Sequence, residues 1–155
     1  GWMYTEQYRQ CYENIEAIDI ILLMLGTNDS NRVATTTSDK VWGEDDTQMF
    51  IRSGEYILKS FAEKNPDIKY YLMNCPVYYG TGAFGSEAVC LAQVQMFDAL
   101  VAGGYDVEWV DMRSFTNEYL GRSLFPDLLH PNNEGYRRIG FKMMSVLTNT
   151  EYPLD

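Results

Sequence analysis

Hydrophobic residues follow two different spacings along the chain, and the change from one to the other predicts alternating helices and strands. Short runs rich in apolar residues predict three strands: one from Ile18 to Leu25, one over 68–73 and one over 107–110. Between these runs, apolar residues recur every three or four positions, which is typical of amphipathic helices. Strands that alternate with helices pair in parallel, so the pattern predicts a layered α/β fold.

Four helices are predicted, and polar or helix-breaking residues mark their ends. Thr5, Thr47 and Ser86 each precede a helical pattern and are expected to cap it. Asn65-Pro66 and Gly103-Gly104 are expected to end the second and third helices. The inward faces are expected at Tyr4, Tyr8, Cys11 and Ile15; at Phe50, Gly54, Ile57 and Phe61; at Cys90, Val94, Phe97 and Val101; and at Tyr136, Ile139, Met143 and Leu147 of a helix over 132–147.

Two long loops, over 26–46 and 74–85, follow the first two predicted strands. The carboxyl ends of parallel strands lie at one edge of the sheet, where ligand sites of such folds are found. Loops longer than about 12–15 residues in a compact domain usually carry function or are disordered. Four aromatic residues of these loops either hold a sugar or acyl group or pack within the loops: Trp42, Tyr78, Tyr79 and Phe84.

Composition narrows the classes of function. The chain has 155 residues, which fits one domain over 1–155, and 12 basic against 22 acidic residues give a net charge of −10. This sign, without any basic stripe, argues against nucleic acids and anionic membrane surfaces as partners. The apolar runs are too short to span a bilayer. Cys11, Cys75 and Cys90 are odd in number and dispersed, so we expect buried or half-buried thiols rather than a disulfide framework or a zinc site.

The first candidate motif is Gly-Thr-Asn-Asp, directly after the first predicted strand. Gly26 permits a tight turn, and the amide of Asn28 would then project from the carboxyl edge of the sheet. A side-chain amide offers N–H donors that suit a developing oxyanion. Gly, Asn and Asp are also ordinary turn residues, so the motif taken alone equally fits a simple turn.

The second candidate motif is Asp-Leu-Leu-His-Pro, just before the last predicted helix. His130 is the only histidine, and a single histidine is often structural or merely exposed. Asp127 lies three residues earlier, however, and in a short loop its carboxylate can accept from Nδ1–H of His130. That bond would leave Nε2 as a base, which is how such pairs activate a hydroxyl or thiol nucleophile.

Together, the two motifs and the α/β pattern between them resemble the SGNH or GDSL hydrolase family of esterases and acyl hydrolases. Gly26, Asn28 and Asp29 match its Gly-x-Asn-Asp block, and Asp127 and His130 match its Asp-x-x-His block. The resemblance implies a flavodoxin-like α/β/α sandwich, His130 as base, Asp127 as its orienting carboxylate and Asn28 as oxyanion donor. It implies a small ester as substrate, with acetylated carbohydrates favoured by the aromatic loops, and neither a metal nor an organic cofactor.

The Gly-Asp-Ser block, which supplies the family's nucleophile, does not occur in the sequence. The oxyanion glycine of the family's second block could correspond to Gly1, which could equally be a cloning remnant. Ser30, Ser86 and Cys75 are disfavoured as substitutes because none lies in a strand-to-helix elbow, and Ser86 is better interpreted as a helix cap. We therefore expect a partial domain that lacks its first one or two strands and is catalytically incomplete.

The run from Ile18 to Leu25 independently suggests a missing neighbour. Its apolar residues fall on both faces, as in buried parallel strands, yet the family's strand order would leave one edge of it open. We expect this edge to pair with an N-terminal segment or with another chain. The competing interpretation is a non-catalytic module of the same fold that binds carbohydrate or protein.

Acidic residues at two places in the chain are explained by helix capping and the helix dipole rather than by catalysis or metal binding. Glu44-Asp45-Asp46 should complement the dipole of the following helix rather than bind a metal. Asp111, at the end of the third predicted strand, should cap the segment that follows it.

Overall fold

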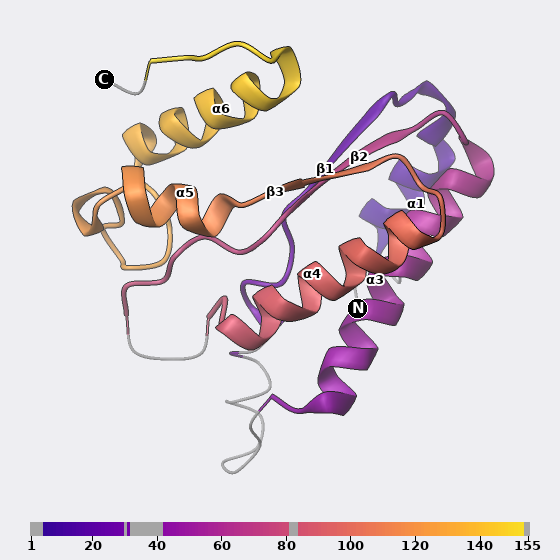
Figure 1. Ribbon diagram of the computed structural model, residues 1–155, viewed down its shortest axis with the longest axis horizontal. Coiled ribbons are helices and arrows are strands. Elements are labelled where there is room, and N and C mark those ends of the chain that lie inside the picture. The colour runs from indigo at the N-terminus through magenta and orange to yellow at the C-terminus, as the bar shows by residue number, and fades with distance from the viewer. Residues whose placement is uncertain (1–4, 30, 32–41, 81–83, 154–155) are drawn as a thin grey trace.

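The computed structural model describes residues 5–29, 31, 42–80 and 84–153, and within them the chain forms a three-stranded parallel sheet flanked by helices (Figure 1). The strands β1 (Ile20–Leu23), β2 (Lys69–Met73) and β3 (Val107–Val110) lie in sequence order. Ile20 is opposite Lys69 in the first pair, and Tyr70 is opposite Val107 in the second. The predicted α/β fold is confirmed, although the first strand is shorter than the run from Ile18 to Leu25.

Helices cover the two faces of the sheet, as Figure 1 shows, with α3 and α4 on one side and α5 and α6 on the other. The helices and 3₁₀ turns of the described residues are α1 (Glu6–Glu13), η2 (Ile15–Ala17), α3 (Glu44–Lys64), α4 (Glu87–Ala102), α5 (Met112–Tyr119), η3 (Arg122–Leu124) and α6 (Asn133–Thr148). No helix in this part of the chain combines the length and apolar character needed to cross a bilayer.

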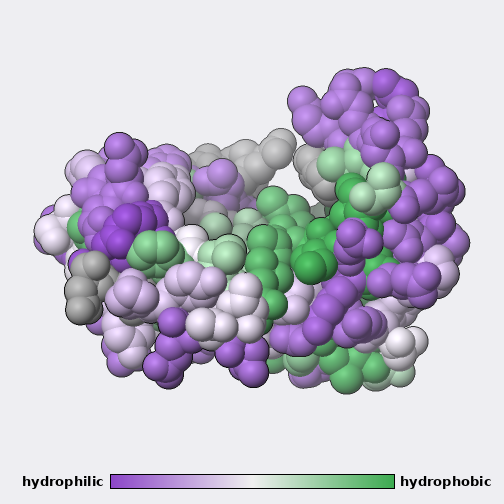
Figure 2. Space-filling model, turned by 90° about the horizontal axis from the view of Figure 1, so that it is seen from above, coloured by the Kyte–Doolittle hydropathy of each residue, from purple (hydrophilic) through white to green (hydrophobic). Residues whose placement is uncertain are grey.

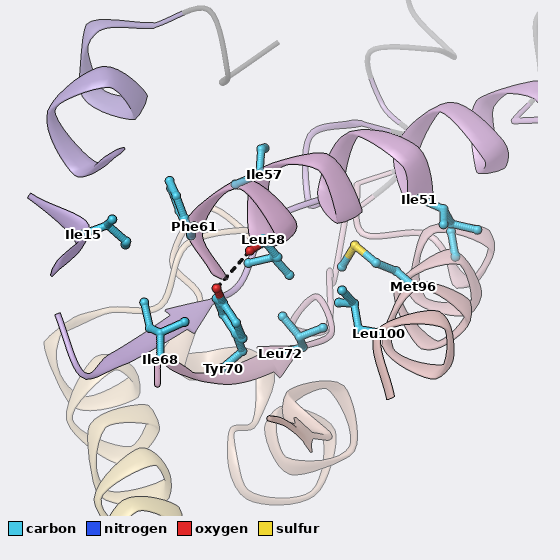
Figure 3. Close-up of a cluster of buried hydrophobic side chains, with 11 residues drawn as sticks. Ile15, Ile51, Ile57, Leu58, Phe61, Ile68, Tyr70, Leu72, Met96 and Leu100 are labelled. Carbon is cyan, nitrogen blue, oxygen red and sulfur yellow. Dashed lines mark hydrogen bonds between the residues drawn. The ribbon is translucent and has the colours of Figure 1, made fainter. Parts of the chain in front are cut away.

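The main core lies between the sheet and the two helices α3 and α4 that cover one of its faces (Figure 3). Leu58 and Phe61 of α3, Leu100 of α4 and Leu72 of β2 are almost completely buried there. Tyr70 is buried among them, and its hydroxyl donates to the carbonyl of Leu58 at 2.9 Å. That bond satisfies the one polar atom of the ring, so the aromatic side chain can pack without an unpaired hydroxyl.

The opposite face of the sheet is only partly covered. Tyr71 and Met73 pack with Phe115 of α5 and Met143 of α6 in a second core. Ile20 and Leu22 of β1 point to this face but are each 45% exposed. Figure 2, which views the molecule from this side, shows an apolar band between two polar regions.

Several helix predictions are confirmed at their ends. Thr5 caps α1 and accepts from the backbone N–H of Tyr8. Asn65 and Gly103 are the C-caps of α3 and α4, and Ser86 occupies the N-cap position of α4. Asp111 caps α5, because its carboxylate accepts from the backbone N–H of Ser114. The last helix begins after Asn132, whose side chain caps it.

Other details of the helix predictions are wrong. The second helix begins at Glu44 rather than after Thr47, because the carboxylate of Asp46 accepts from the N–H of Gly43 and the acidic residues form the first turn. Val94 and Val101 are largely exposed, and so is Tyr136 of α6. The buried face of α4 instead contains Val89, Cys90, Ala92, Gln93, Met96 and Leu100.

Candidate functional site

The first motif forms a tight turn just beyond β1. Gly26 has a φ of +116°, and a Cβ atom there would lie 2.8 Å from Cγ1 of Val89. The backbone N–H of Asp29 donates to the carbonyl of Gly26 at 3.0 Å and closes the turn. Asn28 and Asp29 are exposed, while Gly26 is buried. The turn therefore requires glycine and leaves the Asn28 side chain accessible at the carboxyl edge of the sheet.

Gln93 of α4 joins this turn to the end of β2. It is only 2% exposed, and its amide nitrogen donates to the carbonyl of Leu25 and, at 3.4 Å, to that of Met73. Its amide oxygen accepts from the backbone N–H of Cys75 at 3.3 Å. A buried amide with partners on both strand ends fixes their relative position. The sequence gives no signal for this residue, because a single glutamine in a helix has no distinguishing pattern.

The second motif lies in the loop between η3 and α6. Nδ1 of His130 lies 2.6 Å from Oδ2 of Asp127, the contact that their spacing predicts. The other carboxylate oxygen accepts from the backbone N–H groups of Leu129 and His130 at 3.0 and 2.6 Å. These hydrogen bonds, with the one from the His130 ring the strongest, hold the pKa of Asp127 well below its usual range. The carboxylate therefore stays ionised while the ring of His130 remains exposed.

The backbone of this loop has an unusual conformation at Leu128, whose φ is +67°. Non-glycine residues seldom adopt this left-handed conformation. Hydrogen bonds from neighbouring segments support it, since the N–H of Leu128 donates to the carbonyl of Phe125 at 2.9 Å and its own carbonyl accepts from Tyr79 at 3.0 Å. The left-handed residue turns the chain so that Asp127 and His130 face each other.

One segment, the loop after β2, contacts both motifs. The N–H of Gly85 donates to the carbonyl of Thr27 at 2.8 Å, and the N–H of Tyr79 donates to that of Leu128 at 3.0 Å. In the described residues, no hydrogen bond or ion pair joins Asn28 directly to Asp127 or His130. The two motifs are thus linked through this shared loop rather than by a contact of their own.

The aromatic residues of the two loops mostly pack against their surroundings. Tyr79 packs at a tilt against Phe125 with ring centroids 5.1 Å apart, and its hydroxyl donates to the carbonyl of Leu120 at 2.6 Å. Trp42 packs on Phe50 and donates to Thr47 at 2.8 Å. Tyr78 and Phe84 form an edge-to-face pair with centroids 5.1 Å apart. Loop packing therefore explains Trp42 and Tyr79 without a ligand.

Of the residues considered as substitute nucleophiles, the structure describes Cys75 and Ser86, and neither lies in a nucleophile elbow. Cys75 is fully buried, and Ser86 lies at the N-cap position of α4. Ser30 and Gly1 lie outside the described residues. Within the described part of the chain, no cluster of three or more His, Cys, Asp or Glu side chains could hold a metal ion.

Comparison with known families identifies one match. The sequence model of the GDSL-like lipase/acylhydrolase family matches residues 2–138, a stretch that contains both motifs. No curated protein matches the chain.

Proposed function

The chain belongs to the GDSL-like lipase/acylhydrolase family, and from this premise we propose that it supplies the base and one oxyanion donor of a serine ester hydrolase. The family itself supports a general acylhydrolase function. The observation that carries the finer proposal is the 2.6 Å contact between His130 and Asp127, with the imidazole exposed to incoming substrate. A carboxylate on Nδ1 leaves Nε2 as the proton acceptor.

In the proposed reaction, a serine hydroxyl attacks the carbonyl carbon of an acyl ester while Nε2 of His130 takes its proton. The side-chain amide of Asn28 donates to the oxyanion that forms. Charge develops there only in the tetrahedral species, so this donor favours the transition state over the ground state. His130 then protonates the leaving alcohol, and a water molecule, activated in the same way, releases the acid and regenerates the serine.

The nucleophilic serine is proposed to lie outside the 155 residues, on a strand or chain that pairs with β1. Among the described residues β1 has a partner on one side only, and Ile20, Leu22 and Leu25 are 45–46% exposed. An open strand edge offers backbone hydrogen-bonding groups to an added strand, and the adjacent apolar face offers burial. A strand added there would end beside the Gly26 turn, because parallel neighbours share their carboxyl edge.

The proposed substrates are small acyl esters, with acetylated carbohydrates favoured. Tyr78 and Phe84 support this choice, because both belong to the loop that contacts the two motifs. Aromatic faces suit the apolar face of a sugar or an acyl group. The family-level argument for sugars remains an analogy between folds.

A fluorophosphonate probe that labels activated serines tests the proposal. The chain alone should show no labelling and almost no hydrolysis of an aryl acetate. The product of a longer reading frame that carries an upstream strand ending in Gly-Asp-Ser should be labelled on that serine and should hydrolyse the ester. Labelling should fall sharply in the longer product with His130→Ala and partly with Asp127→Asn.

Asp98→Asn is the matched control for Asp127→Asn, since Asp98 is exposed on α4 away from both motifs. It should leave labelling unchanged. Labelling of Ser86 or another serine within the chain would overturn the proposal that the nucleophile lies elsewhere. Absence of labelling in both the chain and the longer product would instead favour the non-catalytic binding module.

A further inference from the structure

A polar cleft lies at the carboxyl ends of β2 and β3. It has a volume of about 420 Å³, and Asn74, Cys90, Asp111 and Arg113 line it together with exposed residues of α4. Neither Asp127 nor His130 lines this cleft. Its chemistry is therefore separate from that of the proposed hydrolase site.

Cys75 and Cys90, which are 15 residues apart in sequence, meet behind this cleft. Cys75 follows β2 and is fully buried, whereas Cys90 lies in the first turns of α4 and is 8% exposed on the cleft side. Both pack with Val89 in one small cluster. The thiol of Cys75 lies 3.9 Å from the carbonyl oxygen of Leu25, and that of Cys90 lies 3.9 Å from the carbonyl oxygen of Gly85. The two cysteines are thus neighbours in one buried cluster.

Arg113 of α5 places a positive charge beside this pair. Its Nη1 lies 3.9 Å from Sγ of Cys90 and is anchored by a 2.7 Å hydrogen bond to the carbonyl of Gly85. The neighbouring thiol of Cys75 and the charge of Arg113 outweigh burial and hold the pKa of Cys90 below its ordinary value. Glu87 and Asp111 are the other charged groups that line the cleft.

We propose that Cys90 and Cys75 form a peroxide-reactive dithiol, in which Cys90 is the attacking thiolate and Cys75 the resolving thiol. The Cys90 thiolate attacks one oxygen of a hydroperoxide, the O–O bond breaks, and Cys90 becomes a sulfenic acid while water or an alcohol leaves. The thiol of Cys75 then attacks the Cys90 sulfur, the S–O bond breaks, and a second water leaves. Two thiols are oxidised to one disulfide, and the peroxide is reduced.

The arrangement fits the needs of each step. Attack requires a stabilised thiolate that a small oxidant can reach, and Cys90 has Arg113 beside it and an open cleft in front. Resolution requires a second thiol beside the first, and Cys75 packs in the same small buried cluster as Cys90. Cys11, on α1, lies apart from this cluster and serves as an internal reference.

Mass spectrometry of the peroxide-treated chain tests the proposal. Trypsin leaves both cysteines on one peptide, since no Lys or Arg occurs between Tyr70 and Arg113, and cleavage after Glu87 separates them. We expect the two fragments to stay linked until a reductant is added. At neutral pH Cys90 should react at least about fivefold faster than Cys11, because the thiolate is the nucleophile.

Variants assign the roles. Arg113→Gln should slow the oxidation of Cys90, whereas Arg122→Gln, at an exposed position of η3, should not. Cys75→Ser should convert the product from a disulfide into a sulfenic or sulfinic acid on Cys90. If Cys75→Ser fails to fold, the linked fragments of the unchanged chain still show whether Cys75 and Cys90 form a disulfide. Oxidation of Cys11 before Cys90, or overoxidation of Cys90 with Cys75 still reduced, would overturn the proposal.

Discussion

Replacing Gly26 with alanine should destabilise the protein more than any comparable glycine substitution on its surface. The φ of +116° is far from the left-handed minimum near +57° that other residues tolerate. The new methyl group would also lie 2.8 Å from Val89, 3.2 Å from Gln93 and 3.3 Å from Phe50. These neighbours belong to two different helices, so relief of one contact does not relieve the others.

The expected cost follows from two separate terms. Forcing a residue into a sparsely populated backbone conformation costs about 1–3 kcal/mol. Inserting a methyl group into a packed site costs about 1–3 kcal/mol more. Gly26→Ala should therefore lower the free energy of unfolding by about 2–6 kcal/mol. At about 2–4 °C per kcal/mol for a chain of this size, the melting temperature should fall by at least about 4 °C.

Substitutions at two further glycines separate the cost of backbone strain from the cost of packing. Gly104 has a φ of +80°, and a Cβ atom there would have no neighbour within 4 Å, so Gly104→Ala should show backbone strain alone, about 1–2 kcal/mol. Gly140, in α6, also has open space, so Gly140→Ala should stabilise by about 0.5–1 kcal/mol. Thermal and urea unfolding followed by circular dichroism would measure all three. Equal losses for Gly26→Ala and Gly104→Ala would refute the packing argument.

Three other predictions concern buried contacts and pH. Gln93→Met should lower the free energy of unfolding by about 1–3 kcal/mol in urea, because it removes the amide from three backbone partners, whereas exposed Gln95→Met should not. Gly54→Ala would bring a methyl group 2.1 Å from Sδ of Met96, so a double-mutant cycle with Met96→Ala should give a coupling of about 1 kcal/mol or more. Burial would raise the pKa of Asp111, but hydrogen bonds from the next helical turn lower this pKa overall. The ionised carboxylate therefore contributes to stability above about pH 4, and this contribution is lost as the pH falls further. Acid unfolding of Asp111→Asn should therefore depend less steeply on pH than that of the unchanged chain.

The strands could be predicted from sequence because short runs rich in apolar residues have few other uses in a short α/β chain. Val107–Val110 has the predicted bounds, and the second strand differs by one residue. The first was predicted too long at both ends, because Ile18 lies before pairing with β2 begins and Met24 and Leu25 remain apolar beyond the point where it ends. Hydrophobicity marks what can be buried, whereas a strand's limits depend on where its neighbour stops.

The inward face of α4 could not be predicted for a related reason. Apolar residues occur on all its sides, so a spacing through Val94 and Val101 looked as good as the real one. The face is decided by Gln93, a polar residue that is buried because the ends of two strands need its hydrogen bonds. Periodicity assigns polar residues to the solvent side, and it fails where a buried amide has partners from distant parts of the chain.

The two motifs differ in which contacts position them: one depends on its own loop, and the other depends on distant parts of the chain. The orientation of His130 depends on local contacts, since Asp127 receives its hydrogen bonds from the same short loop. The position of Asn28 depends on Gln93 and Gly85, which hold the Gly26 turn from the start of α4 and the loop before it. Changes near α4 should therefore displace Asn28, the proposed oxyanion donor, while leaving the Asp127–His130 pair intact. Under the proposed mechanism, such a variant would keep its base but lose the stabilisation of charge in the transition state, which is a loss in the rate of the chemical step rather than in substrate binding.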